Sequence, residues 1–492
     1  MIYGYLAVML ISMNRSSTAA IEPPRLNQRA PGNEAAPGNA DFAALKRRDN
    51  LTNWLYLGGV WAIIAATILS ALALEAYIAS EGLHWGWTVL VVATAALITG
   101  ASQHNLGGAV HEGTHGLLFN NKILNELASD WLAAFPIYTS TYQYRVQHFA
   151  HHQFVNDPVR DPDISQLKDS NHWLDFPIVQ WDILRALLRQ LWLPNLMLYT
   201  LVRARYSSVG HEGNPYLSET QRRHGWPTKI GLGFAIGSAF LVNFVLVSTT
   251  SVWAAHATII GAYVATIAYF AFLPEEKFPQ SRLQPVISHR ATMIGRMTFL
   301  FVIYWGLTAL DAGTGTLTHW NTFGRYWVIP LFTTFPLYMM MRQWVQHGNA
   351  DRGRFTNTRV FFFGPMLRYA VFPWGMDYHL PHHVMAAVPH YNLKALHTAL
   401  VARDPEYAAK GIEIEGIWHA PHMHDDQAPS VAKRPLRQSL MYALSLRHEG
   451  PSTERAHVDN TTLEGTVIAD RAAIDQIAAA SAAAREEVRR TG

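Results

Sequence analysis

Four uncharged apolar runs dominate the pattern of hydrophobic and polar positions along the chain. They occupy residues 55–74, 85–103, 230–248 and 252–273. Each run is long enough for an α-helix to cross a hydrocarbon layer of about 30 Å. Only short polar segments separate the members of each pair, so the pattern predicts two helical hairpins in a lipid bilayer.

Two shorter apolar runs follow, at residues 297–310 and 326–341. Pro330 and Pro336 interrupt the second run, and proline breaks the hydrogen-bond ladder of a helix. The two runs fit either a third hairpin or a re-entrant pair. We therefore predict an all-α integral membrane protein with four to six transmembrane helices and a cytoplasmic helical cap.

The polar segments between the runs set the expected orientation. Residues 104–226 and 342–397 contain no clean spanning run, and the first of them is rich in Lys and Arg. By the positive-inside rule both segments lie in the cytoplasm, and we expect a bacterial inner membrane. Residues 123–138 and 173–199 mix apolar and charged positions, so we expect them to lie along the membrane surface.

The composition divides the chain into three parts. Residues 16–39 are rich in Pro, Gly, Asn and Ala without periodicity, and we predict a disordered lead-in over residues 1–45. Residues 46–403 form the predicted membrane domain. We expect residues 404–492 to be a soluble tail that is partly helical, because residues 470–490 are rich in alanine.

Charge and cysteine usage exclude several classes of function. The 492 residues are 49% hydrophobic and only 15% charged, and the net charge of +3 comes from scattered Lys and Arg. Nucleic acid is therefore not an expected partner. The chain has no cysteine, which excludes disulfides, cysteine-bound clusters and a thiol nucleophile. Any redox partner must be a separate protein.

Histidines form three clusters, each within or beside one of the two polar segments. They are His111 and His115, spaced i, i+4; His148, His151 and His152, spaced i, i+3, i+4; and His379, His382 and His383, spaced likewise. On a helix such spacings place the imidazoles together. An even number of crossings separates the second cluster from the third, so all three end on one side of the membrane.

This many imidazoles points to a transition-metal centre. Neutral imidazole is the commonest protein metal ligand, and zinc is satisfied by four ligands. Eight imidazoles can surround two first-row transition ions and leave positions open for dioxygen. We predict two iron ions, because iron chemistry can cleave unactivated C–H bonds. Neighbouring carboxylates are expected to orient the ligands, although their simplest role is to cap helices and turns; they are Asp157, Asp161, Asp163 and Asp377.

Two other kinds of protein also fit parts of the pattern. His111 to His115 reads H-E-x-x-H, the pattern of zinc metalloproteases in which Glu112 would be the general base. That interpretation leaves the other two clusters without a role. A membrane protein that binds metal without catalysis is the third possibility.

The clusters resemble a known family. HEGTH, HFAHH followed by NDPVRDPD, and HLPHH with the later PHYNL are similar to the three histidine boxes of the integral-membrane fatty acid desaturase superfamily, over residues 107–393. The resemblance implies a non-haem di-iron enzyme that uses dioxygen to remove two hydrogens from an acyl chain. It also implies an external electron donor, a ferredoxin or a cytochrome. By the same resemblance His347 becomes a ninth ligand, and Asn349 a group that supports it.

Some features depart from the simplest pattern of that family. Four apolar runs lie between the second and third boxes, where the common desaturase has two. The HPGG motif of a fused cytochrome is absent from the sequence. The motifs leave open a hydroxylase, a ketolase or a decarboxylase on the same centre, and a substrate that is a lipid or a specialised metabolite.

Overall fold

Helices make up most of the computed structural model, which describes residues 39–446 except 179, 210–224, 250, 279, 313, 315 and 419–435. Within this part, five helices are long and apolar enough to cross a membrane. The prediction of an all-α integral membrane protein with four to six spans is confirmed. The five helices are α3 (Thr52–Ser80), α4 (Gly86–Thr114), α10 (Trp226–Thr249), α11 (Val252–Phe272) and α12 (His289–Asp311).

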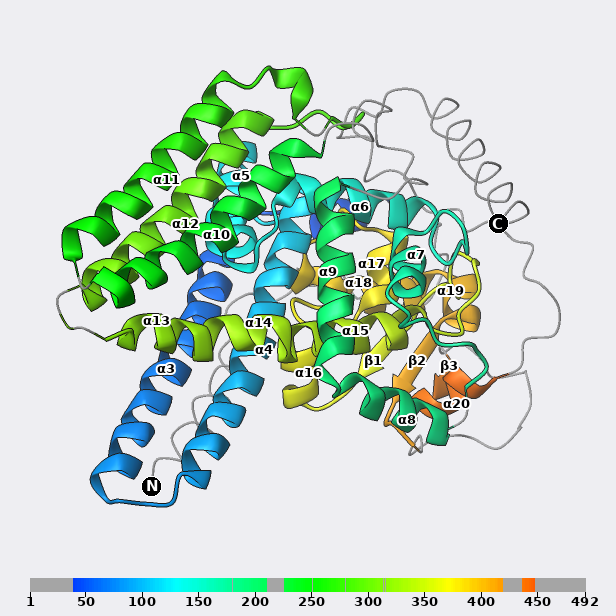
Figure 1. Ribbon diagram of the computed structural model, residues 1–492. Helices are drawn as coiled ribbons and strands as arrows, with labels where there is room; N and C mark the ends of the chain where they lie inside the picture. Colours follow the sequence, from blue (N-terminus) through cyan, green and yellow to red (C-terminus); the bar gives the residue numbers. More distant parts are fainter. Residues whose placement is uncertain are drawn as a thin grey trace, which may run out of the picture.

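Helices α3 and α4 form the first hairpin, which projects from the body of the protein (Figure 1). Their turn contains Gly82 at φ 60°, a conformation that glycine adopts without strain. The second half of α4 is almost wholly buried. It therefore extends beyond the predicted run, to Thr114, because protein rather than lipid covers its polar residues.

Helices α10, α11 and α12 form a separate bundle beside this hairpin (Figure 1). Its core includes Val242, Ile259, Met297 and Tyr304. Large apolar side chains face outward, including Phe272, which is 88% exposed. Such an apolar outer surface suits contact with lipid chains rather than with water.

The sixth predicted run is not one continuous helix. Helix α13 (Thr318–Phe323), the π-helical turn η5 (Gly324–Val328), α14 (Ile329–Phe332) and α15 (Thr334–His347) follow one another, in a row that leads from the α10–α12 bundle back to the centre of the molecule (Figure 1). The break falls at Thr333, between the two prolines. Helix α12 is one of the five candidate spans, whereas no helix of this broken row is. The choice between a third hairpin and a re-entrant pair therefore stays open.

Short helices connect the spans in the middle of the chain. The stretch predicted at 123–138 is helical, and 173–199 contains α8 and the first turns of α9; their place at the membrane surface stays a prediction. The elements are α5 (Lys122–Ser129), η1 (Asp130–Ala134), η2 (Phe135–Ile137), α6 (Thr141–Gln153), α7 (Pro162–Asp169), α8 (Gln180–Gln190), α9 (Leu193–Val209) and η4 (Glu275–Lys277).

The C-terminal part adds a small parallel sheet in the order β1-β2-β3 and several short helices. The elements are β1 (Val360–Phe362), α16 (Pro365–Val371), α17 (His379–Val384), η6 (His390–Asn392), α18 (Leu393–Arg403), α19 (Pro405–Lys410), β2 (Ile412–Glu415), β3 (Leu436–Gln438) and α20 (Leu440–Ser445).

Both predicted domain limits fall inside packed structure. Helix α2 (Asn39–Leu45) belongs to the predicted lead-in, yet the Leu45 carbonyl accepts a hydrogen bond from Asn392. In the predicted tail, Leu444 of α20 packs in a core with Phe361, and its carbonyl accepts from Ile178. Residues 1–38 and 470–490, where we predicted disorder and a helix, lie outside the described residues.

The contact of α4 with α15 gives a test of the fold. A Cβ on Gly100 would lie 2.8 Å from the Phe335 backbone nitrogen and would also strike the Thr334 side chain. We expect Gly100→Ala to lower the free energy of unfolding by about 1–3 kcal/mol, because overpacking forces the helices apart. Thermal unfolding in detergent micelles measures this.

The matched control is Gly58→Ala in α3, where an added Cβ meets nothing within 4 Å. Alanine favours helix over glycine, so this variant should be as stable as the native protein or slightly more stable. Equal melting temperatures for the two variants would contradict the packing described here.

Candidate metal centre

The first histidine box lies at the end of α4, which Arg145 of α6 holds in place. Arg145 donates from Nε to the Thr114 carbonyl at 2.8 Å and from Nη2 to the Gly113 carbonyl at 2.9 Å. These carbonyls have no partner within the helix, because a helix leaves its last four carbonyls free. Arg145 also forms a buried ion pair with Glu126 of α5. Three helices are thus joined at the point where His111 and His115 emerge.

Helix α6 carries the second box and begins at a capped end. Ser140 precedes it and accepts a hydrogen bond from the Gln143 backbone. His148 and His152, four residues apart, take part in one group of imidazoles, and His151 takes part in a second. One helix thus supplies both groups.

Helix α17 carries the third box and divides it in the opposite sense. His379 and His383, four residues apart, belong to the second group, and His382 belongs to the first. Pro381 stands in the first turn of this short helix, where its missing N–H causes no loss. His347, the last residue of α15, completes the second group.

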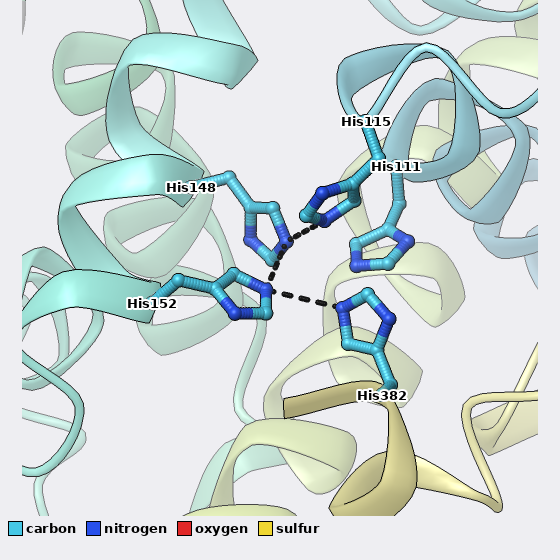
Figure 2. A group of neighbouring side chains, drawn as sticks. All are labelled: His111, His115, His148, His152 and His382. Carbon is cyan, nitrogen blue, oxygen red and sulfur yellow. Dashed lines mark hydrogen bonds between the residues drawn. The ribbon is translucent and has the colours of Figure 1, made fainter. Parts of the chain in front are cut away.

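The structure therefore brings all nine predicted ligands into two groups. Within each group, one ligand atom from every residue lies within 4.8 Å of the others, and Figure 2 shows the rings of the first group turned toward one another. The first group contains His111, His115, His148, His152 and His382; the second contains His151, His347, His379 and His383.

The nitrogen contacts within the groups fit a shared cation. Nε2 of His148 lies 2.9 Å from Nε2 of both His115 and His152, and a single hydrogen cannot satisfy both contacts. His111 has both ring nitrogens buried without a hydrogen-bond partner in the described part of the chain. In the second group, Nε2 of His379 lies 2.9 Å from Nε2 of His347 and 3.1 Å from Nε2 of His383. Lone pairs gathered in this way suit a metal ion.

The electrostatics keep most of these imidazoles neutral. Burial, together with the neighbouring imidazoles, holds the pKa of His148, His152 and His383 well below the usual range. A neutral ring has a free lone pair, so these residues are ready to bind metal. Burial also acts to lower the pKa of His151, but the carboxylate of Asp161 outweighs it and raises that pKa to about 9.

Asp161 and His151 form the contact that is typical of a metal-bound histidine. The Asp161 oxygens lie 3.0 and 3.1 Å from Nδ1 of His151, which leaves Nε2 to face the second group. A carboxylate in this position fixes the tautomer and the orientation of the ring. The nine imidazoles are enough for two first-row transition ions with open positions.

Comparison with known proteins agrees with this arrangement. Residues 85–293 and 268–412 match the family described as "Fatty acid desaturase". Together the two ranges span the histidine boxes and most of the described chain. The chain belongs to the fatty acid desaturase family.

A curated relative of this desaturase-family protein is "Dihydrorhizobitoxine desaturase" from Bradyrhizobium elkanii. The two are 29% identical over 119 residues, which are 24% of this chain and 30% of the relative. The match thus covers less than a third of the relative's length.

The other predicted supporting residues have varied contacts. Asp163 lines a cavity with His151 and His347. Asp157 pairs with Arg160 and Arg352 at 2.7 and 2.8 Å, and Asp377 pairs with Arg368 at 2.8 Å. Asn349 donates to the carbonyls of Ala443 and Leu446, so it anchors α20 beside His347. That these groups support metal binding stays a prediction.

Two buried charges at the centre escaped the sequence analysis. Arg145 and Glu126 form the clamp described above, and no pattern in the sequence marked these two charges as buried. Glu112 was considered only as a protease base. It is fully buried, and Oε2 accepts a hydrogen bond from the His390 backbone at 3.0 Å, which joins the first box to the segment after the third.

The clamp at the end of α4 can be tested with one pair of variants. Arg145→Met leaves Glu126 charged, buried and without its ion-pair partner, so we expect a loss of about 3–5 kcal/mol in stability and less metal bound per chain. Thermal unfolding and metal analysis of the purified protein measure both. Arg145→Met combined with Glu126→Met removes both charges and should recover most of the lost stability. If the single variant were as stable as the double variant, the ion pair would not hold the helices together.

The role of Asp161 has its own test. Asp161→Asn keeps the size of the side chain and its capping of α7 but removes the charge beside His151. We expect metal affinity to fall about 10- to 100-fold, as measured by metal titration. Asp157→Asn removes the ion pairs with Arg160 and Arg352 and leaves the hydrogen bond between Asp161 and His151 in place. This variant should bind metal like the native protein. Equal affinities for the two variants would remove Asp161 from the metal site.

Proposed function

We propose that the protein is an oxygen-dependent desaturase that introduces a double bond into a fatty acyl or lipid-like chain. The two histidine groups would hold two iron ions, and a separate ferredoxin or cytochrome would supply electrons. The observation that supports this proposal most is the pair of buried groups of five and four imidazoles beside apolar helices. Family membership agrees with it.

The overall reaction balances with an external reductant. One –CH2–CH2– unit, one dioxygen, two electrons and two protons give one –CH=CH– unit and two waters. When bound, iron supplies the activation of dioxygen that lets hydrogen be removed from an unactivated C–H bond. The protein's own part is to keep its imidazoles neutral by burial, to orient His151 through Asp161, and to exclude water from the reacting carbons.

The proposed function includes a cellular location for the protein. The histidine groups lie at the ends of α4 and α15, and the intervening segments are rich in Lys and Arg. By the positive-inside rule this end faces the cytoplasm. We propose a bacterial inner membrane, where a soluble electron carrier reaches the centre from the cytoplasm.

A second candidate is a related oxidation of a specialised metabolite. The relative with a partial match is named for dihydrorhizobitoxine rather than for a fatty acid. Hydroxylation, ketone formation or decarboxylation would use the same residues, since these outcomes differ in the fate of the substrate after hydrogen removal. A zinc protease has less support, because Glu112 is buried and hydrogen bonded to the His390 backbone rather than open to a water.

Lipid and metabolite profiling of a host with and without the gene tests the proposal. Desaturation gives products lighter by two mass units, and hydroxylation gives products heavier by sixteen. We expect His382→Ala to lose iron and product together, since His382 is one of five ligands of the first group. His319→Ala is the control, because His319 pairs with Asp311 outside both groups. Product from purified His382→Ala, or one zinc without iron in the native protein, would overturn the proposal.

A further inference from the structure

Arg342 of α15 is a buried cation with no counter-ion. The residue as a whole is only 8% exposed. Nε is fully enclosed without a hydrogen-bond partner, and no ion pair to Arg342 is found among the described residues. A buried charge without a partner is strongly unfavourable. Residues that persist in this state at the interior of a membrane protein are most often functional.

Its position is beside the two histidine groups. Arg342 lies five residues before His347 on α15, or about 7.5 Å along the helix axis. Burial and the neighbouring imidazoles lower the pKa of His379 and His382, and the charge of Arg342 lowers both further. The guanidinium is therefore within electrostatic range of ligands from both groups.

The metal ions would make this arrangement less favourable still. The imidazoles bring no negative charge, and only the carboxylates of Asp161 and Asp163 lie beside them. Two bound iron ions and Arg342 would therefore leave an excess of positive charge in a poorly polarisable interior. Asp161 is already hydrogen bonded to His151. An additional anion near Arg342 would relieve the repulsion.

His104 of α4 adds a second unsatisfied polar atom in the same region. It packs against Phe335 of α15, which lies about two helical turns before Arg342 on the same helix. Nδ1 lies 2.8 Å from the Ala370 carbonyl, so Nδ1 carries the hydrogen and Nε2 has the lone pair. Nε2 is buried without a partner in the described structure. It is placed to accept a hydrogen bond from a ligand.

We propose that Arg342 binds the anionic group of the substrate, a carboxylate, inside the protein beside the histidine groups. A donor group of the same substrate, such as a hydroxyl or an amine, would satisfy Nε2 of His104. The inference rests on the proposed function, since it takes the reacting carbons to lie at the metal ions. It narrows the substrate to a compact acid that reacts a few bonds from its anionic group, rather than at the middle of a long chain.

Binding can be measured without turnover. Calorimetric titration of the purified, iron-loaded full chain would use hexanoate as the acid, 1-hexanol as its uncharged counterpart and inorganic phosphate as a free anion. We expect Arg342→Met to weaken hexanoate binding about 10- to 100-fold, the usual effect of losing a charged hydrogen-bond donor, and to leave 1-hexanol unchanged. Arg342→Lys should recover part of the affinity.

The control is Arg296→Met in α12. Arg296 is a partly buried arginine that donates to Gln143 and to the sulfur of Met293, and it belongs to a different part of the fold. Its substitution should leave hexanoate binding unchanged. Equal hexanoate affinity in the native protein and Arg342→Met would overturn the inference, and so would inorganic phosphate that bound as tightly as hexanoate.

Thermal unfolding separates binding from a structural role. Because Arg342 has no partner, Arg342→Met without ligand should melt at the same temperature as the native protein or higher. A lower melting temperature with loss of iron would show that the arginine is structural and would overturn the inference. If hexanoate binding depends on Arg342 but profiling finds no desaturated product, the anion site stands and the proposed function fails.

Discussion

Nine imidazoles must meet away from water and face inward, most of them neutral, and most of the structure serves this requirement. Burial removes the protons that would otherwise repel one another. It also makes each misplaced polar atom costly. The buried pair of Arg145 and Glu126, the carboxylate of Asp161 and the anchoring amide of Asn349 all hold ligand-bearing segments in place.

The division of the two H-x-x-H-H boxes explains how so few helices build two histidine groups. In α6 the i and i+4 histidines belong to the first group and His151 to the second, whereas in α17 this assignment is reversed. Both groups therefore share the same two helices. Any rotation of α6 relative to α17 would disturb both groups, so packing around these short helices controls the whole centre.

The spacing of residues along the chain made much of the histidine centre predictable. The packing of segments that are distant in the sequence decided which group each histidine joins and where the elements end. Helical periodicity placed His148, His151 and His152 on one helix, but the group that each joins depends on how α6 and α17 face each other. The predicted second span ended near Gln103, whereas α4 continues to Thr114 because protein covers its polar half. The contact of α20 with the core involves too few apolar residues, such as Leu440 and Leu444, to have been recognised in the sequence.

The order of these segments along the chain also constrains the time at which metal can enter. The first residue of the two histidine groups is His111, and the segment that packs beside His347 ends at Leu446. At a synthesis rate of about 5–20 residues per second, roughly 17 to 67 s pass between the two. All five spanning helices emerge from the ribosome before the third box, so bilayer insertion precedes assembly of the centre. Any metal that the two histidine groups bind would thus enter a chain whose membrane helices have already been made, so it could not direct their insertion.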